Sequence, residues 1–561
     1  MIYYYFCYKL YKRLKHKIIF YVINQMGIPS YFSYIIKNYS NIILNQKRLL
    51  QNNIRFSNLL MDCNSIIYDE VRKLEKELPK SKMYSCKEFE NKVINNVIIS
   101  IGNYTKKVSP TGLLFIAFDG VAPFAKMQQQ RTRRHKSIIM SKINTTIDSN
   151  VQSQWSTSNI TPGTEFMNSL SLKVKKAFHG LEGHFNVKKI VVSGSDNCGE
   201  GEHKMFKYIR DKTNKVHGNT LVYGLDSDLI MLSLFHCKPF DQFFIYRETP
   251  EFGKSIINDE NMDSEYLFLN IHSLSKAILT EMNCDTNDYH RLYDYTFICF
   301  LLGNDFLPHF PSLNLRKDGL DILLNIYKEQ FGKFSNRSLI NKNLTIQWRW
   351  VGILFNELAK DERGRIVKEY VLREKMSKRK WNLSDKENKE FTIQNVPVIY
   401  RKQELYIAPE EQFWEQRYYN ALFSHNDKHV KDITYNYLEG LEWVFKYYTN
   451  DCPDWKWAYK FNYPPLFKDI CKFFPKKQVE YFDKDLFNPF SSNLQLAYVL
   501  PLKYRDLLPY HVNEYLTEND SEYFVQEPKY EWAFCRYFWE SHPVLPEIPV
   551  SKLEKWNNLW K

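Results

Sequence analysis

Leu113-Leu-Phe-Ile-Ala-Phe-Asp119 is a short apolar run that ends in a carboxylate, and similar runs recur along the chain. The others are Asn58-Leu-Leu-Met-Asp62, Asn219-Thr-Leu-Val-Tyr223 before Gly224-Leu-Asp-Ser-Asp228, and Lys189-Ile-Val-Val-Ser193 before Gly199-Glu-Gly-Glu-His-Lys204. Runs of this length predict buried strands. Because helical patterns follow three of the four runs, the sequence predicts an α/β fold with a largely parallel central sheet and flanking helices.

Seven acidic residues lie at the ends of these runs or in turns flanked by glycine. They are Asp62, Asp119, Glu200, Glu202, Asp226, Asp228 and Asp305. The carboxyl ends of parallel strands share one crevice, so we expect the acids to converge although they are far apart in sequence. Crowded carboxylates repel one another, and hard divalent cations with oxygen ligands neutralise them most simply. The sequence therefore predicts a metal site.

The bulk composition is that of a large folded protein. The chain has 561 residues, of which 44% are hydrophobic and 16% aromatic, enough for a large core and two or more domains. Its 77 Lys and Arg against 64 Asp and Glu give a net charge of +13. A basic surface around an acidic pocket suits a polyanionic substrate. The alternative is that the basic balance reflects only lysine-rich codon usage.

Cysteine spacing and hydropathy bear on the compartment. The 10 cysteines include no Cys-x-x-Cys pair, which argues against a zinc ribbon or a disulfide framework and favours a reducing compartment. No apolar stretch approaches the roughly 18 residues of a membrane span. We therefore expect a monomeric, cytoplasmic protein with no membrane partner. The basic run Lys375-Met-Ser-Lys-Arg-Lys380 leaves a nuclear location open.

Composition divides the chain into four segments. Residues 1–25 hold two aromatic-rich runs around a basic stretch and are expected to be an extension of unknown role, a membrane-surface anchor, or sequence upstream of a true start at Met26. Residues 26–330 carry all seven acids. Residues 331–395 are charge-rich and are expected to form solvated helix and linker. Residues 396–561 are rich in aromatic residues and are expected to be mainly helical and to buttress the site.

A cationic helical pattern follows directly after Asp119. At 100° per residue, four side chains fall within about 100° of one another: Lys126, Gln130, Arg133 and Arg134. Arginine and lysine side chains suit a terminal phosphate, and glutamine adds a neutral donor. A solvated basic face is the alternative. Because the stripe begins close to a candidate metal ligand, we interpret it as a phosphate site.

These residues resemble the signatures of the XRN family of 5′-to-3′ exoribonucleases. The similar motifs are Met26-Gly-Ile-Pro-Ser-Tyr-Phe32, Ala117-Phe-Asp-Gly-Val-Ala-Pro123, Gln129-Gln-Arg-Thr-Arg-Arg134, Ile160-Thr-Pro-Gly-Thr-Glu-Phe166, Gly199-Glu-Gly-Glu-His-Lys204, Tyr223-Gly-Leu-Asp-Ser-Asp228, Leu302-Gly-Asn-Asp-Phe-Leu-Pro-His309, Tyr437-Leu-Glu-Gly-Leu-Glu-Trp-Val444, Asp454-Trp-Lys-Trp457 and Leu496-Ala-Tyr-Val-Leu-Pro501. The resemblance runs in order from Met26 almost to the end of the chain.

The resemblance implies a fold, an activity and a set of roles. Residues 26–330 would be a nuclease domain resembling the PIN and 5′-nuclease folds. The activity would be processive 5′-to-3′ hydrolysis of single-stranded RNA with a 5′-monophosphate, which releases nucleoside 5′-monophosphates. The seven acids match the family's catalytic residues and ligands of two Mg²⁺ ions, for which Mn²⁺ is the alternative. The four stripe residues match its pocket for the 5′-monophosphate.

The chain also departs from the family pattern. Tyr68 stands where the family usually has a histidine that stacks on the first base, so the stacking face is kept and the titratable nitrogen is lost. Trp455 or Trp457 is expected to supply the opposing face. The sequence stops where cellular members continue, and a compact member without the C-terminal extension domains is therefore expected.

Two other functions stay open at this point. A structure-specific DNA nuclease of the flap-cleaving group would share the acidic crevice, and an inactive RNA-binding scaffold would descend from a nuclease. Three further residues lie beside the acids. His203 and His309 are expected to be structural, because hard cations prefer oxygen. Lys204 is expected either to steady the attacked phosphate or to form a salt bridge.

Overall fold

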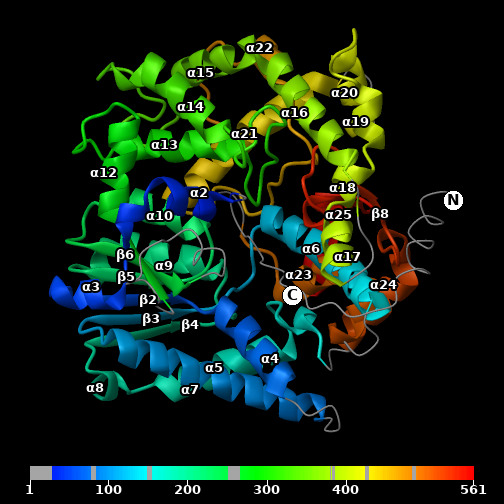
Figure 1. Cartoon of the computed structure of the whole chain (residues 1–561). Coiled ribbons are helices and arrows are strands. Elements are labelled where there is room, and N and C mark those ends of the chain that lie inside the picture. Colours follow the sequence, from blue (N-terminus) through cyan, green and yellow to red (C-terminus); the bar gives the residue numbers. More distant parts are fainter. Residues whose placement is uncertain are drawn as a thin grey trace.

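A seven-stranded mixed sheet lies in the N-terminal half of the molecule (Figure 1). The computed structural model describes residues 28, 30–77, 84–147, 155–249, 266–379, 381, 386–423, 429–482 and 488–560. The strand order is β1-β7-β6-β5-β2-β3-β4. The strands are β1 (Ile43–Leu44), β2 (Asn58–Asp62), β3 (Leu113–Ala117), β4 (Lys189–Ser193), β5 (Thr220–Tyr223), β6 (Phe243–Glu248) and β7 (Tyr266–Asn270).

The five strands from β6 to β4 run parallel, and the other two close one edge of the sheet in antiparallel fashion. The predicted largely parallel sheet is therefore confirmed. In the register, Met61 of β2 lies opposite Ile116 of β3 and Tyr223 of β5, so the three strands end at one level. All residues of these three strands are buried, which explains why their sequences are continuous apolar runs rather than alternating ones.

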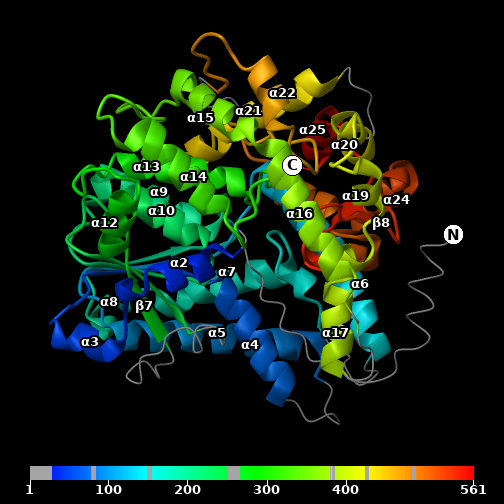
Figure 2. The same cartoon turned by 45° about the horizontal axis from the view of Figure 1, so that its top comes forward.

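Helices cover both faces of the sheet (Figures 1 and 2). Alternate residues of β2 point to opposite sides: Leu59 and Met61 join the smaller core, whereas Leu60 joins the main core. The smaller core is completed by α4 (Asn64–Glu77), α5 (Cys86–Val108) and α7 (Glu165–Phe178). The main core contains α9 (Gly201–Arg210), α10 (Asp228–His236), α12 (Ile271–Glu281) and α13 (Arg291–Cys299).

The main core continues into the aromatic-rich C-terminal region, where Trp348, Trp443 and Trp556 are almost fully buried. The helices of this half are α14 (Gly319–Tyr327), α15 (Trp348–Lys360), α16 (Glu362–Ser377), α17 (Lys386–Gln394), α18 (Val396–Ile399), α19 (Lys402–Ile407), α20 (Trp414–Phe423), α21 (Val430–Thr449), α22 (Phe467–Phe473), α23 (Ser492–Val499), α24 (Tyr510–Asn519) and α25 (Val550–Leu559). A small hairpin pairs β8 (Lys529–Glu531) with β9 (His542–Val544).

The remaining helices lie near the sheet ends or along the cleft: α2 (Tyr31–Asn38), α3 (Gln46–Gln51), α6 (Phe124–Ile147) and α8 (Glu182–Phe185). The charge-rich segment around α16 has one buried face, where Arg373 donates to Glu404 at 2.6 Å. Among the described residues, no helix is long and apolar enough to cross a bilayer. The nine cysteines in the described part of the chain are free thiols. Residues 1–25 and the start at Met26 lie outside the described residues.

Candidate active site

The acids come from different strands and turns to one large cleft of about 3610 Å³. Asp62 ends β2, Asp119 follows β3, and Asp226 lies in the turn after β5. These three and Glu200, Glu202 and Asp305 line the cleft. Asp228, the first residue of α10, does not line it, but its carboxylate lies within 4.8 Å of those of Glu202 and Asp226. All seven candidate acids therefore belong to one carboxylate cluster or its rim.

Several carboxylate oxygens of this cluster are buried without a hydrogen bond. Within the described residues, Asp62 Oδ1, Glu202 Oε2 and Asp228 Oδ1 have no hydrogen-bond partner. Burial, reinforced by the neighbouring acids, raises the pKa of all three carboxyls well above the usual value. The same causes raise the pKa of Asp226 to about 6. Unpaired buried oxygens of this kind are costly, and a bound cation would satisfy them.

The donor set fits a divalent metal ion. Two groups each bring three ligand atoms within 4.8 Å of one another: Glu202, Asp226 and Asp228, and Glu200, Glu202 and His203. Six of the seven candidate acids are buried, and the unpaired oxygens point to where a cation would be held. Carboxylate oxygens are the ligands that Mg²⁺ and Mn²⁺ prefer.

Asp119 is held in place by backbone and amide groups. Gly201 N–H donates to its Oδ1 at 2.7 Å, Asn64 Nδ2 donates to its Oδ2, and its own N–H donates to Asn64 Oδ1 at 3.2 Å. The next residue must be glycine, because a Cβ on Gly120 would lie 1.8 Å from the carbonyl oxygen of Asn197. This close approach lets Gly120 N–H bond to Gly199 O at 2.9 Å, which joins the Asp119 turn to the turn before Glu200.

A tight turn presents Asp305. Gly303 has a φ of +85°, and a Cβ there would lie 2.7 Å from the backbone nitrogen of His309. Asn304 Oδ1 accepts from the backbone N–H groups of Phe306 and Leu307, both at 2.9 Å. The motif Leu302-Gly-Asn-Asp305 therefore forms a tight turn that places the carboxylate of Asp305 in the cleft.

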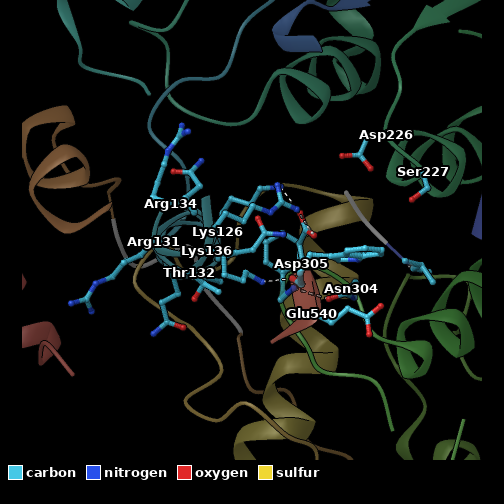
Figure 3. A pocket seen from close by; sticks show the side chains of 18 of the residues that line it. Lys126, Arg131, Thr132, Arg134, Lys136, Asp226, Ser227, Asn304, Asp305 and Glu540 are labelled. Atoms are coloured by element: carbon cyan, nitrogen blue, oxygen red, sulfur yellow. Dashed lines mark hydrogen bonds and ion pairs between the residues drawn. The ribbon is translucent and has the colours of Figure 1, made fainter. Parts of the chain in front are cut away.

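Lys126 connects this acid to the rest of the cluster. Its Nζ donates to Asp305 Oδ2 at 2.7 Å and also pairs with Glu200 (Figure 3). Burial would lower the pKa of Lys126, but Asp305, Glu200 and Glu202 raise it well above the usual value. Burial likewise opposes ionisation of Asp305, yet Lys126 and Arg133 hold the pKa of that carboxyl well below its usual range. Both groups are therefore charged at neutral pH.

The four stripe residues all line the cleft, but they make different contacts. Arg133 is one-third exposed, and its guanidinium lies 3.3 Å from Asp305 Oδ1. Gln130 Oε1 accepts from Gln495 Nε2 at 3.3 Å. Arg134 donates to the carbonyl oxygens of Thr157 and Ile160 and to Thr161 Oγ1. The structure thus brings Lys126 and Arg133 to the acids and ties Arg134 to a neighbouring loop.

The aromatic candidates separate into two groups. Tyr68 lies on α4 and is half-buried. Tyr68 and Trp457 both line the cleft. The Trp457 ring stacks on Trp443, with centroids 5.3 Å apart. Trp455 is not among the residues that line the cleft. Its ring packs against the main core, and its carbonyl accepts the Phe124 N–H at 2.9 Å.

The histidines and Lys204 have structural surroundings. The His203 ring stacks on Tyr447 with centroids 3.7 Å apart, and burial lowers its pKa well below the usual value. Burial also lowers the pKa of His309. Lys204 Nζ donates to the carbonyl oxygens of Phe118 and Gly194, both at 2.8 Å. It forms no ion pair among the described residues, so the expected salt bridge is not found and Lys204 instead ties together the ends of two strands.

Some residues that support the site were not expected from the sequence. Tyr447 Oη donates to Glu200 Oε1 at 2.8 Å, and Tyr448 bonds to Asp228. Both tyrosines lie on α21. No local motif predicts the contact between Tyr447 and Glu200, which are 247 positions apart in the sequence. Asn64 follows Asp62 by two residues, so its position after a strand end is the one signal that sequence reasoning had available.

Fold and site together define a class of protein. A parallel sheet carries buried carboxylates at its carboxyl edge, and a cationic helix starts beside them, which is the arrangement of metal-dependent phosphate chemistry on an α/β fold. Residues 26–249 match the domain described as the XRN 5′-3′ exonuclease N-terminus, and residues 286–412 and 371–553 match the Xrn1 helical domain. The chain belongs to the XRN family.

Curated relatives carry names that agree with this family. The chain is 26% identical over 623 residues to 5′-3′ exoribonuclease 1 of Saccharomyces cerevisiae, a match that covers 86% of this chain and 40% of the yeast protein. It is 24% identical to 5′-3′ exoribonuclease 2 of Gallus gallus, with 94% and 69% covered. It is 26% identical to 5′-3′ exoribonuclease 1 of Homo sapiens, with 94% and 34% covered. The chain thus spans from about one-third to about two-thirds of the length of these relatives.

Proposed function

We propose that the protein is a processive 5′-to-3′ exoribonuclease. Its substrate is single-stranded RNA with a 5′-monophosphate, and its products are nucleoside 5′-monophosphates. The observation that carries this proposal is Asp305, which contacts the cationic stripe through Lys126 and Arg133 and also lies at the acid cluster. A phosphate site and a metal site that share one carboxylate suit a substrate whose end is held beside the bond that is cut.

The acid cluster supplies the hydrolytic site in this proposal. Asp62, Asp119, Glu200, Glu202, Asp226, Asp228 and Asp305 would hold two Mg²⁺ ions, and Mn²⁺ has the same ligand preference. When bound there, such ions supply an activated water and stabilise the leaving oxygen. The protein's own contribution is to orient the carboxylates, which it does for Glu200 through Tyr447 and for Asp119 through Gly201 N–H.

The stripe would set the direction of degradation. Lys126, Gln130, Arg133 and Arg134 would bind the 5′-monophosphate, and Arg133 is the most exposed guanidinium next to the acids. Tyr68 and Trp457, which line the same cleft, would hold the first base between them. Trp455 has less support, because it is not in the lining. After each cut, the new 5′-phosphate would move into the same pocket, which makes the reaction processive.

The two halves of the chain would have separate roles. We propose that residues 26–330 form the nuclease domain, that residues 331–395 link the halves, and that residues 396–561 buttress the site. Two contacts support the last role: Tyr447 bonds to Glu200, and Gln495 bonds to Gln130. We also propose that the protein acts as a monomer in the cytoplasm or in the nucleus.

One assay tests the proposal directly. RNAs identical except for a 5′-hydroxyl, monophosphate or triphosphate end are incubated with the protein and Mg²⁺, and the products are separated. We expect the monophosphate RNA to be degraded fastest and to yield nucleoside 5′-monophosphates. Arg133→Gln should reduce the preference for monophosphate by roughly tenfold or more, because it removes a charged hydrogen-bond donor. Lys142→Gln, on the same helix but outside the cleft lining, should keep it.

The same assay, with flap DNA added as a substrate, also tests the two other functions. Preference for flap DNA over RNA would indicate a structure-specific DNA nuclease. Absence of released mononucleotides from the wild-type protein would indicate a scaffold. The double variant Asp226→Ala, Asp228→Ala should lose hydrolysis and still bind RNA, since it removes two carboxylates from the cluster and no cation from the stripe.

A further inference from the structure

Arg247 is a partly buried cation whose guanidinium makes no hydrogen bond or ion pair with any other residue that the structure describes. Its Nε is inaccessible and has no partner, and its guanidinium carbon lies 3.7 Å from the centroid of the Phe32 ring. Burial lowers the pKa of Arg247 to about 10, while Glu248 and Asp226 favour its charged form. The side chain is therefore a protonated guanidinium that lies over an aromatic ring and donates no hydrogen bond to a described residue.

The position of Arg247 in the sheet places it beside the acids. Tyr246 of β6 pairs with Tyr223 of β5, so Arg247 follows at the level of the turn that carries Asp226. Along the sheet edge the strands run β3, β2, β5 and β6. Their ends carry Asp119, Asp62, Asp226 and Arg247. Arg247 therefore ends a row of three acids, about three strand spacings of roughly 4.8 Å from β3.

The cationic stripe contacts the acid cluster at Asp305 and Glu200, not at β6. Helix α6, which carries Lys126 and Arg133, begins just after Asp119. Figure 3 shows Asp226 on the opposite side of Asp305 from Lys126 and Arg134. Arg247 and the stripe both line the same cleft. The cleft thus holds two separate cationic groups beside the acids: the stripe at Asp305, and Arg247 at the end of β6.

We propose that Arg247 binds the RNA phosphate that follows the scissile phosphodiester, an inference that rests on the proposed function. With the 5′-phosphate on the stripe and the first phosphodiester at the acids, the strand leaves the acids on the β6 side. A planar guanidinium matches two phosphate oxygens, and a phosphate would supply the partner that the inaccessible Nε lacks among the described residues. Arg247 is a positioning residue: it fixes the strand on the far side of the bond that is cut.

Substrate length isolates this contact. A 5′-phosphorylated dinucleotide contains the scissile bond and no phosphate after it, whereas a trinucleotide adds that one phosphate. We expect the ratio of kcat/KM for trinucleotide over dinucleotide to fall about 10- to 100-fold in Arg247→Gln, mainly through KM. Cleavage of the dinucleotide should be nearly unchanged. Arg247→Lys should be intermediate, because it keeps the charge and loses the fork.

A matched control and a chemical control accompany the variant. Arg349 also lies over an aromatic ring, 5.1 Å from the centroid of Trp350, but it is not in the cleft lining, so Arg349→Gln should keep the wild-type ratio. A trinucleotide whose second internucleotide linkage is a neutral methylphosphonate should lower the ratio for the wild type and not for Arg247→Gln. The Tm of Arg247→Gln should fall only slightly, since the contact with the Phe32 ring is lost but no hydrogen bond to a described residue is lost.

Three results would overturn the proposal. An equal loss on dinucleotide and trinucleotide would mean that Arg247 acts as a counter-charge for Asp226. If Arg247→Gln changed only the inhibition by the released mononucleotide, Arg247 would bind the phosphate of the product instead. If the wild type cleaves neither substrate, the proposed function fails. Binding measured by anisotropy then tests the Arg247 contact separately. Equal binding of the charged and the methylphosphonate trinucleotide by the wild type would refute that contact.

Discussion

Two buried tyrosines of α21 differ in whether their hydroxyl group has a hydrogen-bond partner. Tyr447 Oη donates to Glu200 Oε1 at 2.8 Å, whereas Tyr437 Oη is buried with no partner among the described residues. Both rings lie in the main core. Removing the two hydroxyls one at a time therefore separates the effect on the acid cluster from the effect on packing.

Tyr447→Phe should weaken the site without disturbing the core. The ring can still stack on His203, but Glu200 loses the donor that orients it, and we expect kcat/KM to fall roughly tenfold with a higher Mg²⁺ requirement. Steady-state kinetics over a Mg²⁺ titration measure this. Tyr437→Phe is the control and should leave kinetics unchanged and stability equal or higher. Identical kinetics for both variants would show that the Glu200 contact is unimportant.

Single residues also show how far sequence reasoning reached. The acids at strand ends were predictable, because a buried apolar run followed by Asp marks both the strand and its edge. Lys204 was not, because its position beside Glu200 and Glu202 suggested charge pairing, while the fold directs its Nζ to two carbonyls. Tyr447 was not, since its partner is fixed only by tertiary packing. Local patterns locate ligands and leave their supporting contacts undetermined.

At the scale of secondary-structure elements, Glu362 connects the helices α16 and α22. It is the first residue of α16, and its carboxylate accepts from the N–H groups of Phe467 and Lys468 at the start of α22. Burial raises the pKa of Glu362 to about 7, although those two donors oppose the shift. The folded state therefore favours the protonated acid. The stability this gives is complete below pH 4.5 and is lost as the pH rises through 7.

Glu362→Gln should make stability less dependent on pH. Relative to wild type, the variant should gain on the order of 2–3 kcal/mol in free energy of unfolding between pH 4.5 and 8, because its amide does not ionise. Urea unfolding at several pH values measures the gain. Glu374→Gln, on the same helix, should show the opposite sign, since a hydrogen bond from Lys378 holds the pKa of Glu374 below its usual value. A constant difference for Glu362→Gln would contradict the expectation.

The elements themselves were largely predictable where apolar runs are continuous. The runs at 189–193 and 58–62 form β4 and β2 with the same bounds, and the run at 113–118 forms β3 except for its last residue, Phe118. The cationic pattern after Asp119 forms α6. The charge-rich segment was harder to interpret: Arg373 and Glu404 are buried together, and no apolar period reveals a buried ion pair. The positions of the edge strands β1 and β7 were not predicted from the sequence, and β1 is only two residues long.

For the whole molecule, α6 joins the cleft to the C-terminal region. Arg131 lies between the stripe residues in sequence but is buried, and its guanidinium donates to the carbonyl oxygens of Tyr523 and Pro546, both at 3.0 Å. It also lies 4.9 Å from the centroid of the Tyr498 ring. One helix therefore presents Lys126 and Arg133 to the acids and anchors the C-terminal segment through Arg131.

Arg131→Met should loosen the C-terminal segment. Two partly buried carbonyls lose their donor, so we expect a loss of roughly 1–2 kcal/mol and faster amide hydrogen exchange around 523–546. Hydrogen exchange followed by mass spectrometry reports the location. Arg363, which donates to the carbonyls of Pro409 and Glu410, provides the comparison: Arg363→Met should raise exchange around 409–411 instead. Unchanged exchange at 523–546 in Arg131→Met would exclude the anchoring role.

Lys126 has a thermodynamic consequence for the whole cleft. One ammonium is bonded to Asp305 and Glu200 at the same time, so it serves as counter-ion to carboxylates that a metal would also need. A cation bound to those acids would replace Lys126 as their counter-ion and leave it available to a phosphate. A phosphate that drew Lys126 away would in turn leave the acids more receptive to a cation. By linkage, each ligand strengthens the binding of the other by the same factor.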